Sequence, residues 1–406
     1  MLLIKEDIYS TCKGKCHVID VVNDFEEHQG MWTIIPAIFK ISTHSKWYLL
    51  ADDSSEINIR KVLSRILDAE NISGDFFGFA LQDKRPTIIH HFGFDLPDNF
   101  QYPLISAGVL ISNTVIEKIK NSTDSLKLPS FAIDSSHEFA VSLFKNFNIT
   151  LIDDPKFFCE KPNDHGSCGI WRKNKTEPLE SVESNDIQVM IKTFHGNHKT
   201  RLPILLQTWF KKLPVAEICS DLEDPTIPTI DLKVGNTESG HCSKTWEIMR
   251  RFHGNTNGPS WLLIADDDTL IGWDRLRKML GQYNPKDDLI IGERYGYGFS
   301  LDGNSGYDYP TGGAGMVFTR PAVEKILKEC PKCFSSQDPD DMMIGMCAHM
   351  AKVKIIHENR FHQARVTDYA QELIRSPISF HKFEEIDAVE TYYARLIEKS
   401  YSHAEL

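Results

Sequence analysis

The sequence predicts an α/β protein made of two tandem Rossmann-like units with mostly parallel sheets, the first a degenerate copy of the second. Its length, an internal repeat and the alternation of short apolar strands with amphipathic helices predict this fold. At 406 residues the chain is too long for one ordinary domain and suits two of about 200 residues. Its composition, 41% apolar and 25% charged, is that of a globular protein.

Three blocks of sequence occur twice in the same order, which indicates a tandem duplication. In the first block, Trp-Tyr-Leu-Leu-Ala-Asp-Asp matches Trp-Leu-Leu-Ile-Ala-Asp-Asp. The second block ends in a strand pattern followed by an amphipathic helix, and the third begins with acidic residues and leads into another strand. The matched blocks are residues 47–53 with 261–267, 102–112 with 309–319, and 134–138 with 338–342.

The repeat places a first domain at residues 1–160 and a second at residues 187–406. Residues 161–186 between them are polar and rich in helix and strand breakers, as a linker is. In the second domain the apolar strand Trp261–Ala265 precedes a helical pattern over Thr269–Tyr283, which is typical of a doubly wound sheet. Ligands of such sheets bind beyond the carboxyl ends of the strands.

The charge and hydropathy of the chain exclude two classes of partner. Asp and Glu number 57 against 45 Lys and Arg, giving a net charge of −12, so a nucleic-acid partner is not expected. No apolar run approaches the roughly 18 residues that cross a bilayer, so stable membrane insertion is not expected either. The first residues are too short an apolar stretch for a signal peptide.

Cysteines, glycosylation motifs and the C-terminus favour the lumen of the endoplasmic reticulum. Closely spaced cysteines favour disulfides over a zinc site at Cys330-Pro-Lys-Cys333. The terminal His403-Ala-Glu-Leu406 resembles the retrieval tetrapeptides of that compartment. We therefore expect a lumenal protein whose signal sequence is missing from this chain. The close cysteine pairs are Cys12/Cys16, Cys159/Cys168 and Cys330/Cys333, and the N-x-S/T motifs are at Asn71, Asn121, Asn148 and Asn174.

Three aspartates, Asp266, Asp267 and Asp268, follow directly after the strand at 261–265. Side chains alternate in extended backbone, so Asp266 and Asp268 project together and Asp267 points away. Two carboxylates at the end of a strand suit Mn²⁺ or Mg²⁺, which would bridge the phosphates of a nucleotide. The alternative is an acidic N-cap, since Asp268-Thr269 precedes the predicted helix.

The first copy of the repeat serves as an internal control for these acidic residues. Ser54 stands where the second copy has Asp268, and His137 stands where it has Asp341. A copy that keeps the fold pattern and loses two candidate carboxylates is predicted to be non-catalytic. The comparison marks Asp268 and Asp341 as the functional difference between the two copies.

Glycines and a second acidic block add further candidates. Gly312, Gly313 and Gly315 would let the backbone approach a sugar closely, although a glycine-rich turn is the simpler interpretation. Either Asp340 or Asp341 could take a proton from an acceptor hydroxyl as a general base. N-capping of the following helix is the alternative for both carboxylates.

Two histidines compete as a further metal ligand. His381 lies in Ile-Ser-Phe-His-Lys beside a predicted strand, and His362 lies in Arg-Phe-His-Gln-Ala-Arg. Each could equally be a structural histidine of the core. The residues alone leave the choice between them open.

In its second domain, over about residues 187–385, the sequence resembles the Fringe-type β-1,3-glycosyltransferases. Further segments at 292–298, 361–365 and 377–382 resemble the branch of that family that adds glucose to O-linked fucose on thrombospondin type 1 repeats, and with the degenerate first copy this resemblance covers nearly the whole chain. The motifs that carry the family resemblance are Lys192-Thr-Phe-His195, Arg201, Thr208-Trp209, Ser220-Asp221, Gly240-His-Cys-Ser-Lys244, Ala265-Asp-Asp-Asp268, Gly312-Gly-Ala-Gly315 and Pro339-Asp-Asp341.

The resemblance implies a GT-A fold and an inverting transfer of glucose from UDP-glucose to the 3-hydroxyl of fucose. It implies Mn²⁺, or Mg²⁺, as the cofactor, and Asp341 as the general base with Asp340 as the alternative. The implied metal ligands are Asp266, Asp268 and His381, and the implied nucleotide-side residues are Arg201, Asp221, Lys244, Asp266 and Asp267.

Other functions stay open at this point. The same fold could use another UDP-sugar, such as UDP-N-acetylglucosamine or UDP-galactose. The chain could also be a non-catalytic module that binds glycoproteins in the endoplasmic reticulum, or a metal-dependent phosphohydrolase. Retention of Asp268 and Asp341 in the second copy argues against a purely binding role.

Overall fold

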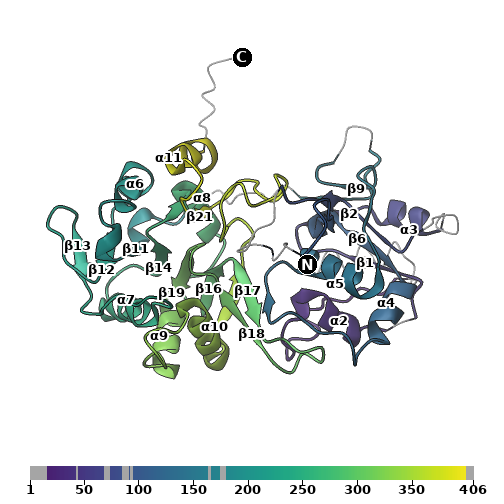
Figure 1. Ribbon diagram of the computed structural model, residues 1–406, viewed down its shortest axis with the longest axis horizontal. Helices are drawn as coiled ribbons and strands as arrows, with labels where there is room; N and C mark the ends of the chain where they lie inside the picture. The colour runs from purple at the N-terminus through teal and green to yellow at the C-terminus, as the bar shows by residue number, and fades with distance from the viewer. Residues whose placement is uncertain are drawn as a thin grey trace, which may run out of the picture. The chain divides into compact units, whose positions relative to one another are not determined.

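The computed structural model forms two compact units (Figure 1). Unit 1 comprises residues 1–176 and 296–306, and unit 2 comprises residues 177–295 and 307–406. The structure describes residues 16–42, 44–67, 74–84, 91, 95–162, 166–173 and 180–398. The tetrapeptide at 403–406, the first 15 residues, Cys12 and the motifs at Asn71 and Asn174 lie outside the described residues.

Unit 2 is built on a seven-stranded, mainly parallel sheet. The first four strands of the sheet are parallel, the fifth is antiparallel to both of its neighbours, and the last two are not adjacent in sequence but pair in parallel. From edge to edge the strands are β13 (Thr229–Asp231), β12 (Ala216–Ser220), β11 (Ile187–Lys192), β14 (Trp261–Asp266), β19 (Met316–Thr319), β16 (Leu289–Gly292) and β20 (Lys354–His357).

The central strands of this sheet are apolar on both faces because helices cover both of them (Figure 1). One face packs against α7 (Cys242–Gly254), α9 (Arg320–Glu329) and α10 (Asp340–Ala351), with buried residues such as Trp246, Phe318 and Ile344 in contact. The smaller helices of unit 2 are α6 (Leu202–Gln207), α8 (Trp273–Leu280) and α11 (Ala388–Thr391).

The predicted helix over Thr269–Tyr283 is wrong at its start. Residues Thr269–Ile271 form strand β15, and α8 begins only at Trp273, after Gly272. Strand β15 pairs with β21 (Ser379–His381), which is 112 positions away in sequence at Thr269↔His381. Pairing with so distant a strand leaves no signal in the local sequence. The periodicity of the downstream helix by itself therefore places the start of the helix too early. The pairing also excludes Asp268 as the N-cap of α8.

Unit 1 repeats the second half of this sheet. Its four strands follow the order β1-β6-β3-β8, with two antiparallel pairs and one parallel pair. The same directions occur in β14-β19-β16-β20 of unit 2, strand for strand, which confirms the duplication. The four strands are β1 (Trp47–Leu50), β6 (Val109–Ser112), β3 (Phe76–Gly78) and β8 (Ile152–Asp153).

This main sheet of unit 1 is less parallel than the sequence predicts. The described residues of unit 1 give it no counterparts of β11, β12 and β13, which contribute three of the parallel pairings of unit 2. The remaining elements are α2 (Ile35–Lys40), α3 (Ile59–Leu67), α4 (Asn113–Lys120), α5 (Ser135–Phe147), β2 (Ser55–Ile57), β4 (Ala80–Leu81), β5 (Tyr102–Pro103), β7 (Phe131–Ala132), β9 (Phe158–Cys159) and β10 (Ile170–Arg172). In the part of the chain that the structure describes, no helix is long and apolar enough to span a bilayer.

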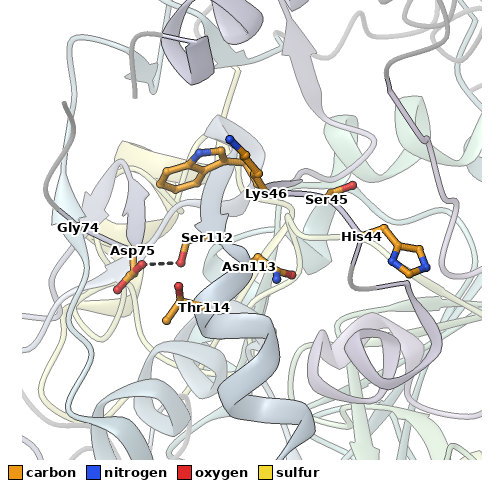
Figure 2. Close-up of a pocket in the computed structure, with 9 residues that line it drawn as sticks. His44, Ser45, Lys46, Gly74, Asp75, Ser112, Asn113 and Thr114 are labelled. Carbon is orange, nitrogen blue, oxygen red and sulfur yellow. Dashed lines mark hydrogen bonds between the residues drawn. The ribbon is translucent and has the colours of Figure 1, made fainter. Parts of the chain in front are cut away.

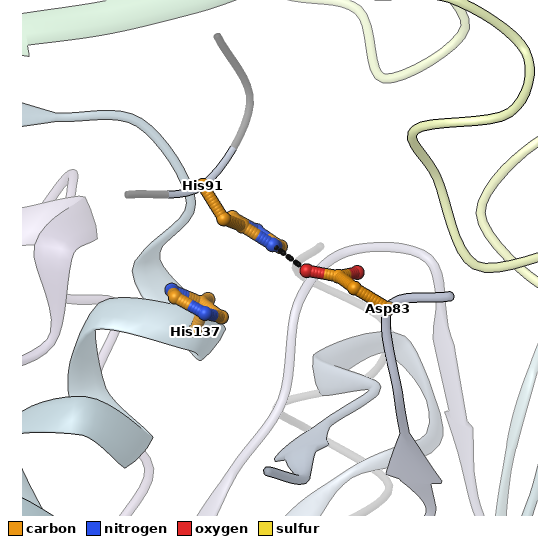
Figure 3. A group of neighbouring side chains, drawn as sticks. All are labelled: Asp83, His91 and His137. Carbon is orange, nitrogen blue, oxygen red and sulfur yellow. Dashed lines mark hydrogen bonds and ion pairs between the residues drawn. The ribbon is translucent and has the colours of Figure 1, made fainter. Parts of the chain in front are cut away.

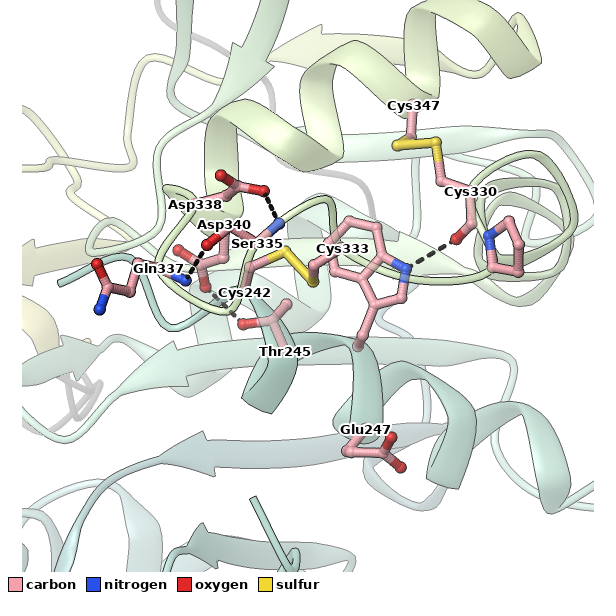
Figure 4. Close-up of a disulfide and its surroundings, with 12 residues drawn as sticks. Cys242, Thr245, Glu247, Cys330, Cys333, Ser335, Gln337, Asp338, Asp340 and Cys347 are labelled. Carbon is pink, nitrogen blue, oxygen red and sulfur yellow. Dashed lines mark hydrogen bonds between the residues drawn. A yellow bond between two sulfur atoms is a disulfide. The ribbon is translucent and has the colours of Figure 1, made fainter. Parts of the chain in front are cut away.

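The disulfides confirm one close cysteine pair and correct another. Cys159 and Cys168 are bonded, as their spacing suggests. Cys330 and Cys333 are instead bonded to Cys347 and Cys242, so they form neither a joint loop nor half of a zinc site. Figure 4 shows these two bridges together with the segment that leads into α10.

The long-range bridge is expected to stabilise the fold more than the local one. Replacing Cys242 and Cys333 by alanine opens a link across 91 residues, whereas Cys159 and Cys168 are only 9 apart. Chain entropy predicts losses of about 4–5 and about 2–3 kcal/mol of unfolding free energy, respectively. Denaturant unfolding of the two double variants checks this order, and equal losses would contradict it.

Candidate active site

The candidate site of unit 2 lies at the carboxyl ends of neighbouring parallel strands. Lys192, the last residue of β11, is the register partner of Asp266, the last residue of β14. Strand β21 brings His381 alongside β15, directly after the aspartates. The N-terminus of α10 supplies Asp340 and Asp341. Parallel strands end at the same edge, so tertiary structure gathers these side chains where α/β sheets bind ligands.

Asp266, Asp268 and His381 form a compact group of metal-binding side chains. One ligand atom of each lies within 4.8 Å of the others. His381 Nε2 is 3.1 Å from Asp268 Oδ1 and 3.9 Å from Asp266 Oδ2. His381 Nδ1 donates to the Gln363 carbonyl at 3.0 Å, an arrangement that leaves Nε2 directed at the carboxylates. Two carboxylates and an imidazole so oriented fit a divalent cation such as Mn²⁺.

Asp268 and His381 shift each other's pKa values. Burial would raise the pKa of Asp268, but the hydrogen bond and charge of His381 lower it below its ordinary value. For His381, burial would lower the pKa, and Asp268 and Asp266 raise it. Deprotonated carboxylates are the form that a metal requires.

Gly313 makes room for the imidazole of His381. A Cβ at Gly313 would lie 2.3 Å from His381 Nδ1 and 2.4 Å from Cε1, so no side chain fits there without moving the ring. Gly312 is different, because a Cβ there would be in ordinary contact at 3.8–3.9 Å with Asp340 and Asp341. The third glycine, Gly315, has a φ of +92°, which favours glycine for conformational reasons.

This difference predicts opposite effects for two neighbouring substitutions. Gly313→Ala displaces the His381 ring and is expected to weaken Mn²⁺ binding about 10- to 100-fold, the loss typical of a disturbed ligand support. Gly312→Ala leaves the ring in place and is the matched control, with Mn²⁺ affinity unchanged. Titration of both variants with Mn²⁺, followed by electron paramagnetic resonance of the free ion, measures the difference. Equal affinities would contradict it.

Asp267 faces away from the other two aspartates. Its carboxylate accepts hydrogen bonds from Thr193 Oγ1 at 2.6 Å, Asn197 Nδ2 at 2.8 Å and Arg201 Nη1 at 2.9 Å. The same Arg201 nitrogen lies 2.9 Å from Asp268 Oδ2. Asp267 is thus occupied by protein partners and holds Arg201, whose guanidinium remains 31% exposed and faces the site.

Asp340 and Asp341 have different surroundings although they are adjacent. Asp340 is buried and forms an ion pair with Lys192, and its Oδ2 also accepts a hydrogen bond from Thr245 (Figure 4). Burial would raise the pKa of Asp340, but the charge of Lys192 lowers it. For Asp341, burial and the neighbouring Asp340 raise the pKa to about 7. Asp341 is partly exposed and accepts from the Gly312 amide at 3.3 Å.

A carboxylate with a pKa near 7 suits proton transfer at neutral pH. Neither aspartate is a side-chain N-cap, since the N-cap position of α10 is Pro339 and no side-chain cap bond forms there. The geometry therefore gives the two residues separate parts. Asp340 is the counterion of Lys192, whereas Asp341 forms no ion pair with Lys192 and is partly exposed.

Two residues assigned to the nucleotide side, Lys244 and Asp221, form their hydrogen bonds with groups other than Asp266, Asp268 and His381. Lys244 is buried, and its Nζ donates to the Thr193 carbonyl at 2.5 Å and to Asn236 Oδ1 at 3.3 Å. Asp221 follows β12 and accepts from the amide and Nδ1 of His195 at 2.8 and 2.9 Å. Burial would raise the pKa of Asp221, but these hydrogen bonds lower it to about 2.

The competing histidine is placed in the core. His362 is 3% exposed, and its ring stacks on Phe380 with centroids 5.0 Å apart and lies 4.6 Å from Tyr369. Among the described residues, the metal-binding group contains His381 and not His362.

Two further residues of the site, Lys192 and Gln363, are not predicted from the sequence. Lys192 Nζ lies 3.2 Å from Asp266 Oδ1 and also forms an ion pair with Asp340. It therefore links the group of Asp266, Asp268 and His381 to the segment that carries Asp340 and Asp341. Gln363 positions His381 through its carbonyl and bonds the Ala314 amide through Oε1 at 2.9 Å. Lys192 ends the mostly apolar run 187–192, and this strand pattern is a usable signal. Gln363 lies in the segment 361–365, but its residue type alone indicates no role in the site.

Unit 1 has a polar cavity of about 420 Å³ at the start of α4 (Figure 2). Lys46, Asp75, Ser112 and Asn113 are among its lining residues. Ser112 Oγ already donates to Asp75 Oδ1 at 2.5 Å, and the cavity holds no group of metal-binding side chains among the described residues. It is therefore a weaker candidate site than the strand ends of unit 2.

Comparison with known proteins gives a consistent result. A sequence family described as Fringe-like matches residues 182–397. The human protein named beta-1,3-glucosyltransferase is 36% identical over 93% of this chain and 77% of its own length. A Xenopus laevis glycoprotein-N-acetylgalactosamine 3-beta-galactosyltransferase 1 is 29% identical over 44% of this chain and 48% of its own. The chicken beta-1,3-N-acetylglucosaminyltransferase radical fringe is 27% identical over 45% of this chain and 56% of its own.

Proposed function

The chain belongs to the Fringe-like family of β-1,3-glycosyltransferases, and we propose that it transfers glucose from UDP-glucose to the 3-hydroxyl of O-linked fucose on thrombospondin type 1 repeats. The observation that carries the proposal is the combination of two features in unit 2. Asp341 is a carboxylate whose pKa is raised to about 7, and Asp266, Asp268 and His381 form a group that could hold a metal ion. The similarity to a glucosyltransferase over 93% of the chain supports glucose as the donor sugar.

Asp266, Asp268 and His381 would hold Mn²⁺, or Mg²⁺ in its place. The donor set, the hydrogen bond that orients His381 and the space left by Gly313 all fit such an ion. When bound, the ion supplies positive charge that stabilises the diphosphate of the leaving nucleotide. Arg201, held by Asp267, adds a second cation on the same side of the aspartates.

Asp341 acts as the general base. Its carboxylate takes the proton of the fucose 3-hydroxyl while that oxygen attacks the anomeric carbon from the face opposite the departing UDP. A single displacement inverts the anomeric centre, so an α-linked donor gives a β-linked product. Lys192 pairs with Asp340 and keeps it ionised, and the charge of Asp340 contributes to the raised pKa of Asp341.

We also propose the lumen of the endoplasmic reticulum as the location. Three disulfides among the described residues suit an oxidising compartment, and one of them, Cys330–Cys347, encloses the segment with Asp340 and Asp341. The terminal His-Ala-Glu-Leu supports the same location.

A second donor is the leading alternative, because two relatives that match 44% and 45% of the chain carry names that specify galactose or N-acetylglucosamine. A non-catalytic binding module and a phosphohydrolase are the further alternatives.

Incubation of the full chain with Mn²⁺, labelled UDP-sugars and a folded thrombospondin repeat carrying O-fucose tests the proposal. We expect transfer from UDP-glucose that depends on the acceptor and is absent with unfucosylated repeat. Transfer from UDP-galactose or UDP-N-acetylglucosamine alone would replace the donor and keep the family reaction. UDP-sugar cleavage that no acceptor accelerates would favour hydrolysis, and binding of the repeat without turnover would favour the binding module.

A further inference from the structure

Unit 1 holds a second group of metal-binding side chains, Asp83, His91 and His137, which the proposed reaction does not use. One ligand atom of each lies within 4.8 Å of the others. The three come from separate parts of the unit, since Asp83 follows β4 and His137 lies in the first turn of α5 (Figure 3). We propose that this group is a zinc site.

His91 has the hydrogen-bond pattern of a zinc ligand. Its Nδ1 faces Asp83 Oδ2, and its Nε2 lies 3.2 Å from Asp134 Oδ2. Histidines that bind metals commonly donate their second ring N–H to a carboxylate, which fixes the tautomer and the ring orientation. Asp134 is that carboxylate here, and it is itself fixed as the N-cap of α5. His91 Nδ1 is therefore the atom that would meet the ion.

Asp83 is supported in the same way. Its Oδ1 accepts a hydrogen bond from the Tyr102 hydroxyl at 2.7 Å, while Oδ2 faces His91. A carboxylate with one oxygen held by a neighbour and the other directed into the group is the usual arrangement of a monodentate ligand.

His137 is the residue that distinguishes a metal site from an ion pair of His91 with Asp83 and Asp134. Its side chain is 6% exposed and packs at 3.7 Å on the ring of His91 and at 5.1 Å from that of Tyr102. Within the described residues, neither of its ring nitrogens has a hydrogen-bond partner. One of these ring nitrogens lies within 4.8 Å of the ligand atoms of His91 and Asp83, where an ion could meet all three.

An imidazolium of His91 held between Asp83 and Asp134 would account for Asp83 and His91, but among the described residues it would give the ring nitrogens of His137 no partner. Two imidazoles and one carboxylate, with a water as fourth ligand, instead match the tetrahedral preference of zinc. Mn²⁺ and Mg²⁺ prefer sets richer in oxygen, such as the group in unit 2. His137 also occupies the repeat position of the base Asp341, so the first copy exchanged a catalytic carboxylate for a metal ligand.

The test uses the full chain with Asp268→Asn and His381→Ala, so that the unit 2 group does not contribute. After treatment with a chelator, the protein is titrated with Zn²⁺ and, separately, with Co²⁺, whose visible absorption reports tetrahedral coordination. We expect about one ion per chain. Adding His137→Phe, which keeps a ring on His91, is expected to weaken binding by about 100-fold, and Tyr102→Phe by about tenfold.

Circular dichroism of each variant separates loss of the site from loss of the fold. No uptake of zinc by the folded background protein would overturn the proposal. Uptake that neither His137→Phe nor Tyr102→Phe changes would also overturn it. If His137→Phe does not fold, Tyr102→Phe decides, because loss of its hydroxyl leaves the ring packing in place.

Discussion

Asp341→Asn is expected to reduce the turnover number about 10²- to 10⁴-fold and to leave UDP-sugar binding almost unchanged. Asparagine keeps the shape of the side chain next to Gly312 but cannot accept the proton of the attacking hydroxyl. Initial rates at varied donor and acceptor concentrations separate turnover from binding. Asp338→Asn is the matched control. Asp338 lies in the same segment, and its carboxylate accepts a hydrogen bond from the backbone amide of Ser335.

The same assignment fixes the direction of the pH dependence. Asp341 must be ionised to act as a base, and its pKa is raised to about 7 by burial and by Asp340. The ratio kcat/KM is therefore expected to fall about tenfold for each unit of pH below 7 and to level off above it. The raised pKa also means that folding stability falls as the pH rises from about 4, where Asp341 ionises in the unfolded chain, to about 7, and the loss is constant above that pH.

Asp341→Asn removes that ionisation and should unfold no more readily than the parent chain at pH 8. A rate loss that accompanies a fall in unfolding free energy would indicate a damaged fold instead of a missing base. A rate close to that of the parent would exclude Asp341, and the same loss in Asp340→Asn with Lys192 still in place would move the assignment to Asp340.

Loss of the metal ligands is expected to have the second large effect. Asp268→Asn or His381→Ala should weaken Mn²⁺ binding by about 100-fold or more and abolish transfer at micromolar Mn²⁺, as a chelator should in the parent chain. His381 has its Nε2 3.1 Å from Asp268, and no other described histidine belongs to the unit 2 group. Electron paramagnetic resonance of free Mn²⁺ and transfer rates at rising Mn²⁺ measure the two effects.

His362→Phe is the matched control for this experiment. Phenylalanine preserves the stacking on Phe380, so Mn²⁺ affinity should stay at the parental value. Metal binding lost in His362→Phe and kept in His381→Ala would exchange the two histidines. Transfer that persists in the presence of a chelator would remove the metal from the reaction.

The sequence alone determined the duplication, the mainly parallel sheet of unit 2 and the candidate carboxylates. These follow from local patterns, because strand alternation decides that Asp266 and Asp268 share a side and that Asp267 does not. The matched blocks of the repeat made the loss of Asp268 and Asp341 in the first copy visible without any structure.

Only the tertiary structure decided how those candidates are assembled. The pairing of Thr269 with His381 brings the histidine to the aspartates, the ion pair of Lys192 separates the parts of Asp340 and Asp341, and the bridge between Cys242 and Cys333 crosses 91 residues. Each of these contacts joins segments distant in sequence, and local periodicity carries no information about which distant segments meet. The physical reason is that packing of the whole core, and not the preference of any one segment, sets these distances.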